Sequence, residues 1–149
     1  MNWPEYHMAM ARQASRKSKD PSTKVGCVVT DRRENLVSSG YNGFPRGCLD
    51  DYDQFSDRKI KYPRTVHAEA NAILSGERDK MVDARLYVNG LHPCAHCAGL
   101  IINAGITEVF YTQDPNDTDL SERWAWSIEV ARGMFSEAGI KTNLIEIDS

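Results

Sequence analysis

The chain has 149 residues with a formal net charge of −3, and 41% of its residues are hydrophobic and 26% charged. This length and composition indicate one globular domain, 1–149, with its own hydrophobic core. The acidic charge argues against a nucleic-acid partner, no apolar run approaches membrane-spanning length, and the first residues do not resemble a signal peptide. With only four cysteines, too few for a disulfide scaffold, we expect a cytoplasmic protein.

Hydrophobic periodicity and turn residues predict a hairpin followed by alternating helices and strands. The predicted helices lie at 3–18, 67–75, 94–104 and 120–138, and the predicted strands at 24–30, 36–42, 84–88, 106–112 and 142–147. Residues 43–64 are predicted to form a long loop, because they contain glycines, prolines and four aspartates. This order indicates an α/β domain around one mixed sheet.

The helix predicted at 67–75 begins with two ionisable residues, His67 and Glu69, within a stretch rich in Ala, Ile and Leu. Burying such side chains is unfavourable unless they have partners. Two positions apart on a regular helix, they would also point in different directions. Either both side chains are exposed at a helix start, or a group beyond the helix end uses both.

A second unusual segment places Cys94 and Cys97 at the start of a predicted helix, after Pro93. Their spacing directs both sulfurs to one side, and a helix N-terminus favours thiolate, the form that binds metal. Alone, this spacing also fits a redox pair or half of a structural zinc site. His67 supplies a third ligand, and a zinc on two cysteines and one histidine keeps a position open, as catalytic zinc sites do. Glu69 then carries protons and is not a ligand.

His67-Ala68-Glu69 and Pro93-Cys94-Ala95-His96-Cys97 match the H-x-E…P-C-x-x-C signature of zinc-dependent nucleobase deaminases. Together with GYNGFPRGCLDD and PCAHCAGLIINAGITEVFY, they make the chain similar to the deoxycytidylate deaminase family over residues 3–112. The resemblance implies a cytidine-deaminase-like, three-layer α/β/α domain with a mixed five-stranded sheet. It also implies an enzyme that hydrolyses dCMP to dUMP and ammonia with a zinc-bound hydroxide.

The same resemblance assigns one catalytic zinc per chain to His67, Cys94 and Cys97, and the acid–base role to Glu69. It places Asn42 at the sugar and the backbone of Ala68 at the pyrimidine edge. For the phosphate we predict contacts from a cluster of polar side chains near these motifs. Its members are Ser22, Lys24, Arg64 and Thr65. Taken singly, Lys24 and Arg64 are better explained as ordinary solvated charges than as phosphate contacts, and Thr65 also fits a helix cap.

Larger members of the family are hexamers regulated by dCTP and dTTP, so we expect a homo-oligomer, with a hexamer favoured, and an effector site within residues 40–51. The candidate effector residues are Gly40, Tyr41, Asn42, Gly43, Arg46 and Asp50. Glycine lets backbone approach a ligand closely, arginine pairs with phosphate, and Asp50 with Asp51 would hold Mg²⁺ beside a triphosphate. Composition alone favours an ordinary polar surface loop.

Two other functions stay open. One is a related zinc deaminase that acts on another cytosine or purine base, nucleoside or nucleotide, and the other is a non-catalytic module in which zinc only holds the fold. His96 differs from the acidic or amide residue expected between the motif cysteines, and Cys48 has no nearby partners for a second, structural zinc. Trp124 and Trp126 are interpreted as core or subunit-interface residues.

Overall fold

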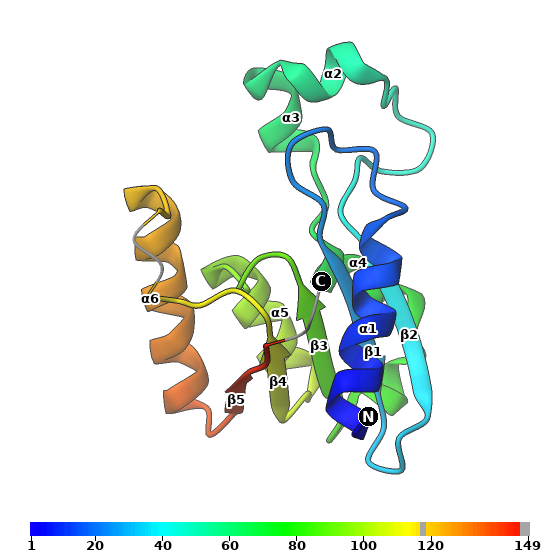
Figure 1. Cartoon of the computed structure of the whole chain (residues 1–149), viewed down its shortest axis with the longest axis vertical. Helices are drawn as coiled ribbons and strands as arrows, with labels where there is room; N and C mark the ends of the chain where they lie inside the picture. The colour runs from blue at the N-terminus through cyan, green and yellow to red at the C-terminus, as the bar shows by residue number, and fades with distance from the viewer. Residues whose placement is uncertain (117–118, 147–149) are drawn as a thin grey trace.

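The computed structural model describes residues 1–116 and 119–146, and within them five strands form one mixed sheet (Figure 1). In chain order the strands are β1 (Gly26–Thr30), β2 (Leu36–Tyr41), β3 (Arg85–Asn89), β4 (Glu108–Tyr111) and β5 (Lys141–Leu144). The order across the sheet is β2-β1-β3-β4-β5. β1 pairs antiparallel with β2 and β3, whereas β3 with β4 and β4 with β5 pair in parallel. The predicted mixed five-stranded sheet is confirmed.

Helices cover both faces of this sheet, so the predicted three-layer α/β/α arrangement is also confirmed. The helices are α1 (Trp3–Ser15), α2 (Tyr52–Ser56), α3 (Arg58–Arg64), α4 (Ala68–Ser75), the 3₁₀ helix η1 (Arg78–Met81), α5 (Ala95–Ala104) and α6 (Glu122–Glu137). α1 packs on one face, and α4, α5 and α6 contribute to the hydrophobic core on the other (Figure 1). None of the helices in the described part of the chain combines the length and apolar character needed to cross a membrane.

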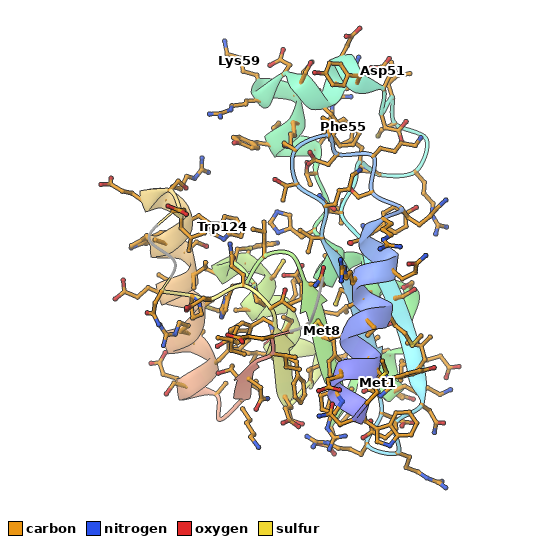
Figure 2. All side chains as sticks on the ribbon, in the orientation of Figure 1. Met1, Met8, Asp51, Phe55, Lys59 and Trp124 are labelled. Atoms are coloured by element: carbon orange, nitrogen blue, oxygen red, sulfur yellow. The ribbon has the colours of Figure 1, made fainter. Side chains whose placement is uncertain are left out.

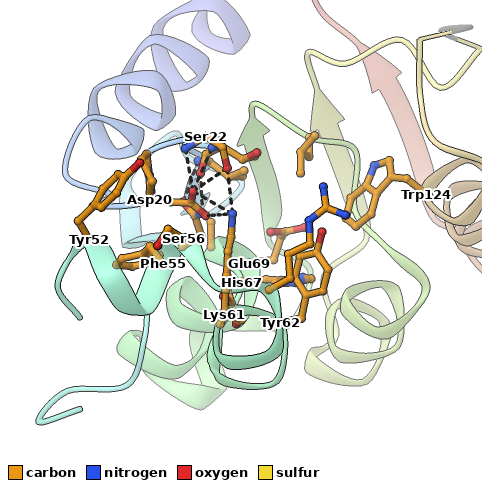
Figure 3. A pocket seen from close by; sticks show the side chains of 18 of the residues that line it. Asp20, Ser22, Tyr52, Phe55, Ser56, Lys61, Tyr62, His67, Glu69 and Trp124 are labelled. Atoms are coloured by element: carbon orange, nitrogen blue, oxygen red, sulfur yellow. Dashed lines mark hydrogen bonds and ion pairs between the residues drawn. The ribbon is translucent and has the colours of Figure 1, made fainter. Parts of the chain in front are cut away.

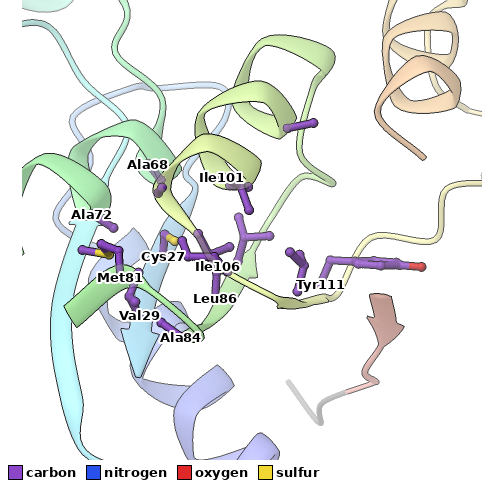
Figure 4. Packing of buried hydrophobic residues seen from close by; sticks show 14 of the residues in the cluster. Cys27, Val29, Ala68, Ala72, Met81, Ala84, Leu86, Ile101, Ile106 and Tyr111 are labelled. Atoms are coloured by element: carbon purple, nitrogen blue, oxygen red, sulfur yellow. The ribbon is translucent and has the colours of Figure 1, made fainter. Parts of the chain in front are cut away.

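The two hydrophobic clusters lie on opposite faces of the sheet. The smaller one joins Met8 and Ala11 of α1 to the sheet, with Tyr87 stacked on Phe110 at 4.5 Å between ring centroids. Figure 2 shows Met8 between α1 and the strands. The larger cluster contains small helix residues and branched strand residues, shown in Figure 4 as Cys27, Val29, Ala68, Ala72, Met81, Ala84, Leu86, Ile101, Ile106 and Tyr111. The alanines bring α4 close to the sheet.

Two glycines permit the closest approach of helices to strands. A Cβ atom at Gly26 would lie 1.9 Å from the Ala11 carbonyl oxygen of α1, and one at Gly40 would lie 2.5 Å from the Ala72 amide nitrogen of α4. Neither distance is compatible with a larger side chain unless the helix moves. Gly40, a predicted effector contact, therefore has a packing role.

The prediction of a loop at 43–64 was wrong, because this segment contains α2 and α3. Two of its aspartates cap the helices: Asp51 accepts a hydrogen bond from the Gln54 amide at 3.2 Å, and Asp57 accepts one from the Lys59 amide at 2.9 Å. Aspartate favours both loops and N-caps, which explains the error. Smaller differences occur at α1, which ends three residues before the predicted boundary, and at β5, which covers 141–144; residue 147 lies outside the described residues.

Candidate active site

The starts of α4 and α5 position the residues of the two motifs. His67 precedes α4 in an extended conformation, with φ −71° and ψ 155°, and Glu69 lies in the first turn. Cys94 is the N-cap of α5, and its sulfur accepts a hydrogen bond from the Cys97 amide at 3.4 Å. Because His67 is not itself helical, the rule that separates helical positions i and i+2 does not apply to it. His67 and Glu69 therefore lie at the same end of α4.

The three candidate ligands form a compact set that fits zinc. Nδ1 of His67 lies 3.3 Å from Sγ of Cys97 and 3.5 Å from Sγ of Cys94, and the three ligand atoms lie within 4.8 Å of one another. Tetrahedral zinc with ordinary Zn–N and Zn–S bonds separates a nitrogen and a sulfur ligand by about 3.5 Å. Two thiols and one imidazole are also the donor types that zinc prefers.

Burial and hydrogen bonding prepare these groups for their chemistry. The Glu69 side chain is buried, which raises the pKa of its carboxyl to about 7 against the opposing effect of His67. Hydrogen bonds from Cys97 and His67 lower the pKa of the Cys94 thiol well below its ordinary value. Zinc, when bound, makes hydroxide available near neutral pH. A carboxyl group that titrates near the working pH is suited to accept a proton and give it back.

His67 and Glu69 line a cavity of about 730 Å³, shown in Figure 3, and the sulfurs of Cys94 and Cys97 contact Nδ1 of His67. We call His67, Glu69, Cys94 and Cys97 the floor of this site. The cavity-facing residues of α3 and its C-cap follow helical spacing: Arg58, Lys61, Tyr62 and Thr65. Together with Trp124 of α6, they form what we call the wall.

The structure brings four of the six predicted substrate residues to the cavity: Ser22, Asn42, Thr65 and Ala68. Lys24 and Arg64 are exposed and are not among its lining residues, and the Lys24 ammonium donates a hydrogen bond to the Ser18 carbonyl. The side-chain amide of Asn42 holds nearby backbone. Its oxygen accepts from the Val25 amide and its nitrogen donates to the Thr23 carbonyl, both at 2.9 Å.

Two residues that sequence reasoning did not identify, Asp20 and Lys61, form a polar cluster with Ser22 in the same cavity. The Lys61 ammonium is 3.0 Å from the Asp20 carboxylate and donates to the Ser22 hydroxyl at 2.9 Å (Figure 3). Burial raises the pKa of Asp20, but hydrogen bonds from Ser22, Lys61 and Thr23 outweigh it, so the pKa is lowered. Asp20 is therefore an anion that holds Lys61 beside Ser22. Helical spacing along α3 is the signal that could have identified Lys61.

The candidate effector segment lies beside this site but is engaged in other contacts. Gly43 pairs with Val66, the residue before His67, through two backbone hydrogen bonds of 3.1 and 2.8 Å. Asp50 forms an ion pair with Lys19 at 3.1 Å, and Asp51 caps α2. The remaining members of the segment, Tyr41 and Arg46, are exposed.

Trp124 was interpreted from the sequence as a core or subunit-interface residue, but the structure places it at the cavity. Its ring centroid is 6.5 Å from that of His67. Trp124 lies at the start of α6, 57 positions after His67 in the chain, so no short sequence motif links it to the site. Trp126 is exposed.

An α/β/α domain with two cysteines, a histidine and a buried glutamate beside an open cavity defines the class of zinc-dependent deaminases. Residues 1–113 match the family model described as the cytidine and deoxycytidylate deaminase zinc-binding region. The chain belongs to the cytidine and deoxycytidylate deaminase family, which confirms the resemblance seen in its sequence.

Several relatives resemble the chain over most of its length. Human deoxycytidylate deaminase is 38% identical over 94% of this chain and 78% of its own, and an uncharacterized deaminase of Aliivibrio fischeri is 39% identical over 98% and 95%. A crystal structure of the dCMP deaminase of cyanophage S-TIM5 in complex with dCMP and dUMP has a TM-score of 0.68, with 95% of each chain covered. At 24% identity, that structure supports the fold alone.

Proposed function

We propose that this protein is a zinc-dependent deoxycytidylate deaminase that hydrolyses dCMP to dUMP and ammonia. The observation that carries the proposal is that His67, one of three clustered zinc ligands, and buried Glu69 line the same cavity as the cationic side chain of Lys61. A zinc site beside a buried glutamate suits the hydrolytic removal of an amino group from a base. The Lys61 ammonium supplies a partner for a phosphate. The named deoxycytidylate deaminases among the relatives support the same substrate.

In this proposal the floor residues divide the chemistry. His67, Cys94 and Cys97 hold the zinc, which supplies the Lewis acidity. Glu69 takes a proton from the attacking water, gives it to N3 of the cytosine and assists the departing ammonia. A proton at N3 makes C4 more electrophilic, so Glu69 contributes both to attack and to departure.

The phosphate is proposed to bind at the wall. Lys61 is held by Asp20 and Ser22, and Arg58 lies one turn earlier on the same face of α3. An ion pair that is already formed needs little reordering of Lys61 when the substrate arrives. Ser22 and Thr65 remain the predicted polar contacts. Lys24 and Arg64 have a weaker case, because neither lines the cavity.

Ammonia release from zinc-loaded protein tests the substrate assignment. The screen compares dCMP, dCTP, deoxycytidine, cytosine, guanine and adenosine. We expect the highest kcat/KM with dCMP and a clearly lower value with deoxycytidine, since a phosphate contact also aligns the base. Equal values for these two would remove the nucleotide assignment and favour a nucleoside or base deaminase.

The regulatory part of the proposal is a hexamer with an effector site for dCTP or dTTP, bound with Mg²⁺, at residues 40–51. We also propose a cytoplasmic location for the protein. The pairing of Gly43 with Val66 supports a direct connection between this segment and His67. We expect the rate to depend sigmoidally on dCMP concentration. dCTP with Mg²⁺ should make this curve hyperbolic, and dTTP should make it steeper. Arg46→Ala should weaken both responses. Hyperbolic saturation unaffected by either triphosphate would refute this part only.

A further inference from the structure

The two tryptophans at the start of α6 have different surroundings, although only Ala125 separates them. Trp126 is 66% exposed, whereas Trp124 is half-buried and lines the cavity. Positions two apart on a helix point to different sides, so α6 presents one indole to the cavity and the other to solvent. Trp124 is therefore the tryptophan that a bound substrate would meet.

Two hydrogen bonds fix the position of Trp124 relative to the zinc ligands. Ser121 caps α6 by accepting a hydrogen bond from the Trp124 amide at 3.2 Å. Ser127, on the same side of the helix as Trp124, accepts one from the Ala95 amide at 3.0 Å. Because Ala95 is the first residue of α5 and follows Cys94, the start of α6 is tied to the helix that carries both cysteines.

The indole stands directly beside the floor of the site. The planes of the Trp124 and His67 rings are inclined by 57°, and their centroids are 6.5 Å apart. In Figure 3, Trp124 and Tyr62 lie on one side of His67 and Glu69, and Asp20 and Ser22 lie on the other. A planar base whose reacting carbon reaches the floor would therefore have an aromatic surface on one side. Indole is a large, rigid partner for such a ring.

We propose that Trp124 is a substrate-binding residue that packs its indole against the cytosine ring and holds the ring over the floor. This inference rests on the proposed deaminase function and adds a base contact to it. Because the contact involves the base and not the phosphate, it serves dCMP and deoxycytidine equally. The wall then has separate parts, with Trp124 for the base and Lys61 for the phosphate.

Kinetics with matched variants test this division. Trp124→Ala should raise KM for dCMP and for deoxycytidine by a similar factor, about 5- to 150-fold, as expected for removal of an aromatic–base contact. Trp124→Phe should restore most of the loss, because it keeps an aromatic face, and Trp126→Ala should have no effect. Zinc content and melting temperature establish that each variant is folded. Unchanged KM values in folded, zinc-loaded Trp124→Ala protein would overturn the inference.

Fluorescence gives a readout that does not depend on turnover. The chain has three tryptophans, so Trp3→Phe with Trp126→Phe leaves Trp124 alone. Saturable quenching by dUMP is expected in that protein, and none in protein with Trp3→Phe and Trp124→Phe. The role of Trp124 would be refuted if dUMP quenched only the protein that lacks Trp124. It would also be refuted if the protein with Trp124 alone showed no quenching while it still deaminated dCMP. Either result would leave the proposed function intact. Quenching of Trp124 in protein that deaminates no cytosine substrate would refute the proposed function instead.

Discussion

The floor and the wall of the cavity are built in different ways. The floor lies at the starts of α4 and α5, where Ala68 and Ala98 pack into the core against the sheet. The wall on α3 belongs to the segment 51–64, which extends from the body of the protein (Figure 1), with Asp51 and Lys59 at its far end (Figure 2). It is joined to the body by contacts such as the Lys61–Asp20 ion pair. In the proposed function, reaction type would therefore depend on the closely packed floor, and recognition of the phosphate on the projecting segment that carries α3.

The largest expected effect comes from removing the zinc ligands of the floor. Cys94→Ser combined with Cys97→Ser should abolish both zinc binding and deamination, because one histidine cannot hold the metal alone. Elemental analysis of purified protein and an ammonia-release assay check this result. Cys48→Ser is the matched control, since Cys48 is exposed and should leave both properties unchanged. Stoichiometric zinc in the double variant would show that the floor has been assigned wrongly.

Glu69→Gln separates metal binding from proton transfer within the floor. The variant should keep zinc and its melting temperature, but kcat should fall by at least about 10²- to 10⁴-fold, because an amide cannot carry the proton. Glu77→Gln is a suitable control, since Glu77 is an exposed glutamate that pairs only with Lys80 among the described residues. Substantial turnover by zinc-loaded Glu69→Gln protein would mean that another residue acts as the base and that Glu69 does not carry the proton.

The wall should affect substrate preference more than the chemical step. Lys61→Met is expected to lower the ratio of kcat/KM for dCMP to that for deoxycytidine by about 10- to 100-fold, the value of a hydrogen bond to a charged group. It also leaves Asp20 buried without its cation, which should reduce stability. Taking the ratio of two substrates cancels any general loss of folded enzyme.

Two further variants sharpen the test of the wall. Asp20→Asn with Lys61→Met removes the uncompensated charge and should recover stability but not the preference for dCMP. Lys59→Met changes a neighbouring exposed lysine that does not line the cavity and should leave the ratio unchanged. An unaltered ratio in Lys61→Met protein would place the phosphate elsewhere.

The same division explains how far the sequence could be interpreted. The zinc ligands and Glu69 lie in two short segments whose spacing and helix-start position are visible in the sequence, so the site could be predicted without a structure. Lys61 and Trp124 could not be assigned in this way. Lys61 lies in a helix within a segment that was predicted to be a loop because it contains several aspartates. Trp124 reaches the cavity only through the packing of α6 on α5. The spacing along α3 would have indicated Lys61 once the helix was recognised, but the tertiary contact that places Trp124 has no local pattern.

The smallest predicted effect concerns Gly40 and Gly43, two glycines that were both expected to serve an effector. A Cβ at Gly40 would meet the Ala72 amide nitrogen at 2.5 Å and the Ala68 carbonyl oxygen at 2.8 Å. A Cβ at Gly43 would have no atom of the described residues within 4 Å, apart from Gly43 and its two chain neighbours. Gly40→Ala should therefore lower the free energy of unfolding by about 1–3 kcal/mol through overpacking of α4 against β2. Gly43→Ala should change it by no more than about 0.5 kcal/mol. Urea denaturation of both zinc-loaded variants measures the difference.

Because α4 carries Ala68 and Glu69, a shift of this helix should also reduce kcat in Gly40→Ala protein. Equal stabilities would mean that α4 adjusts freely, and the rigid floor inferred from its packing would then be wrong.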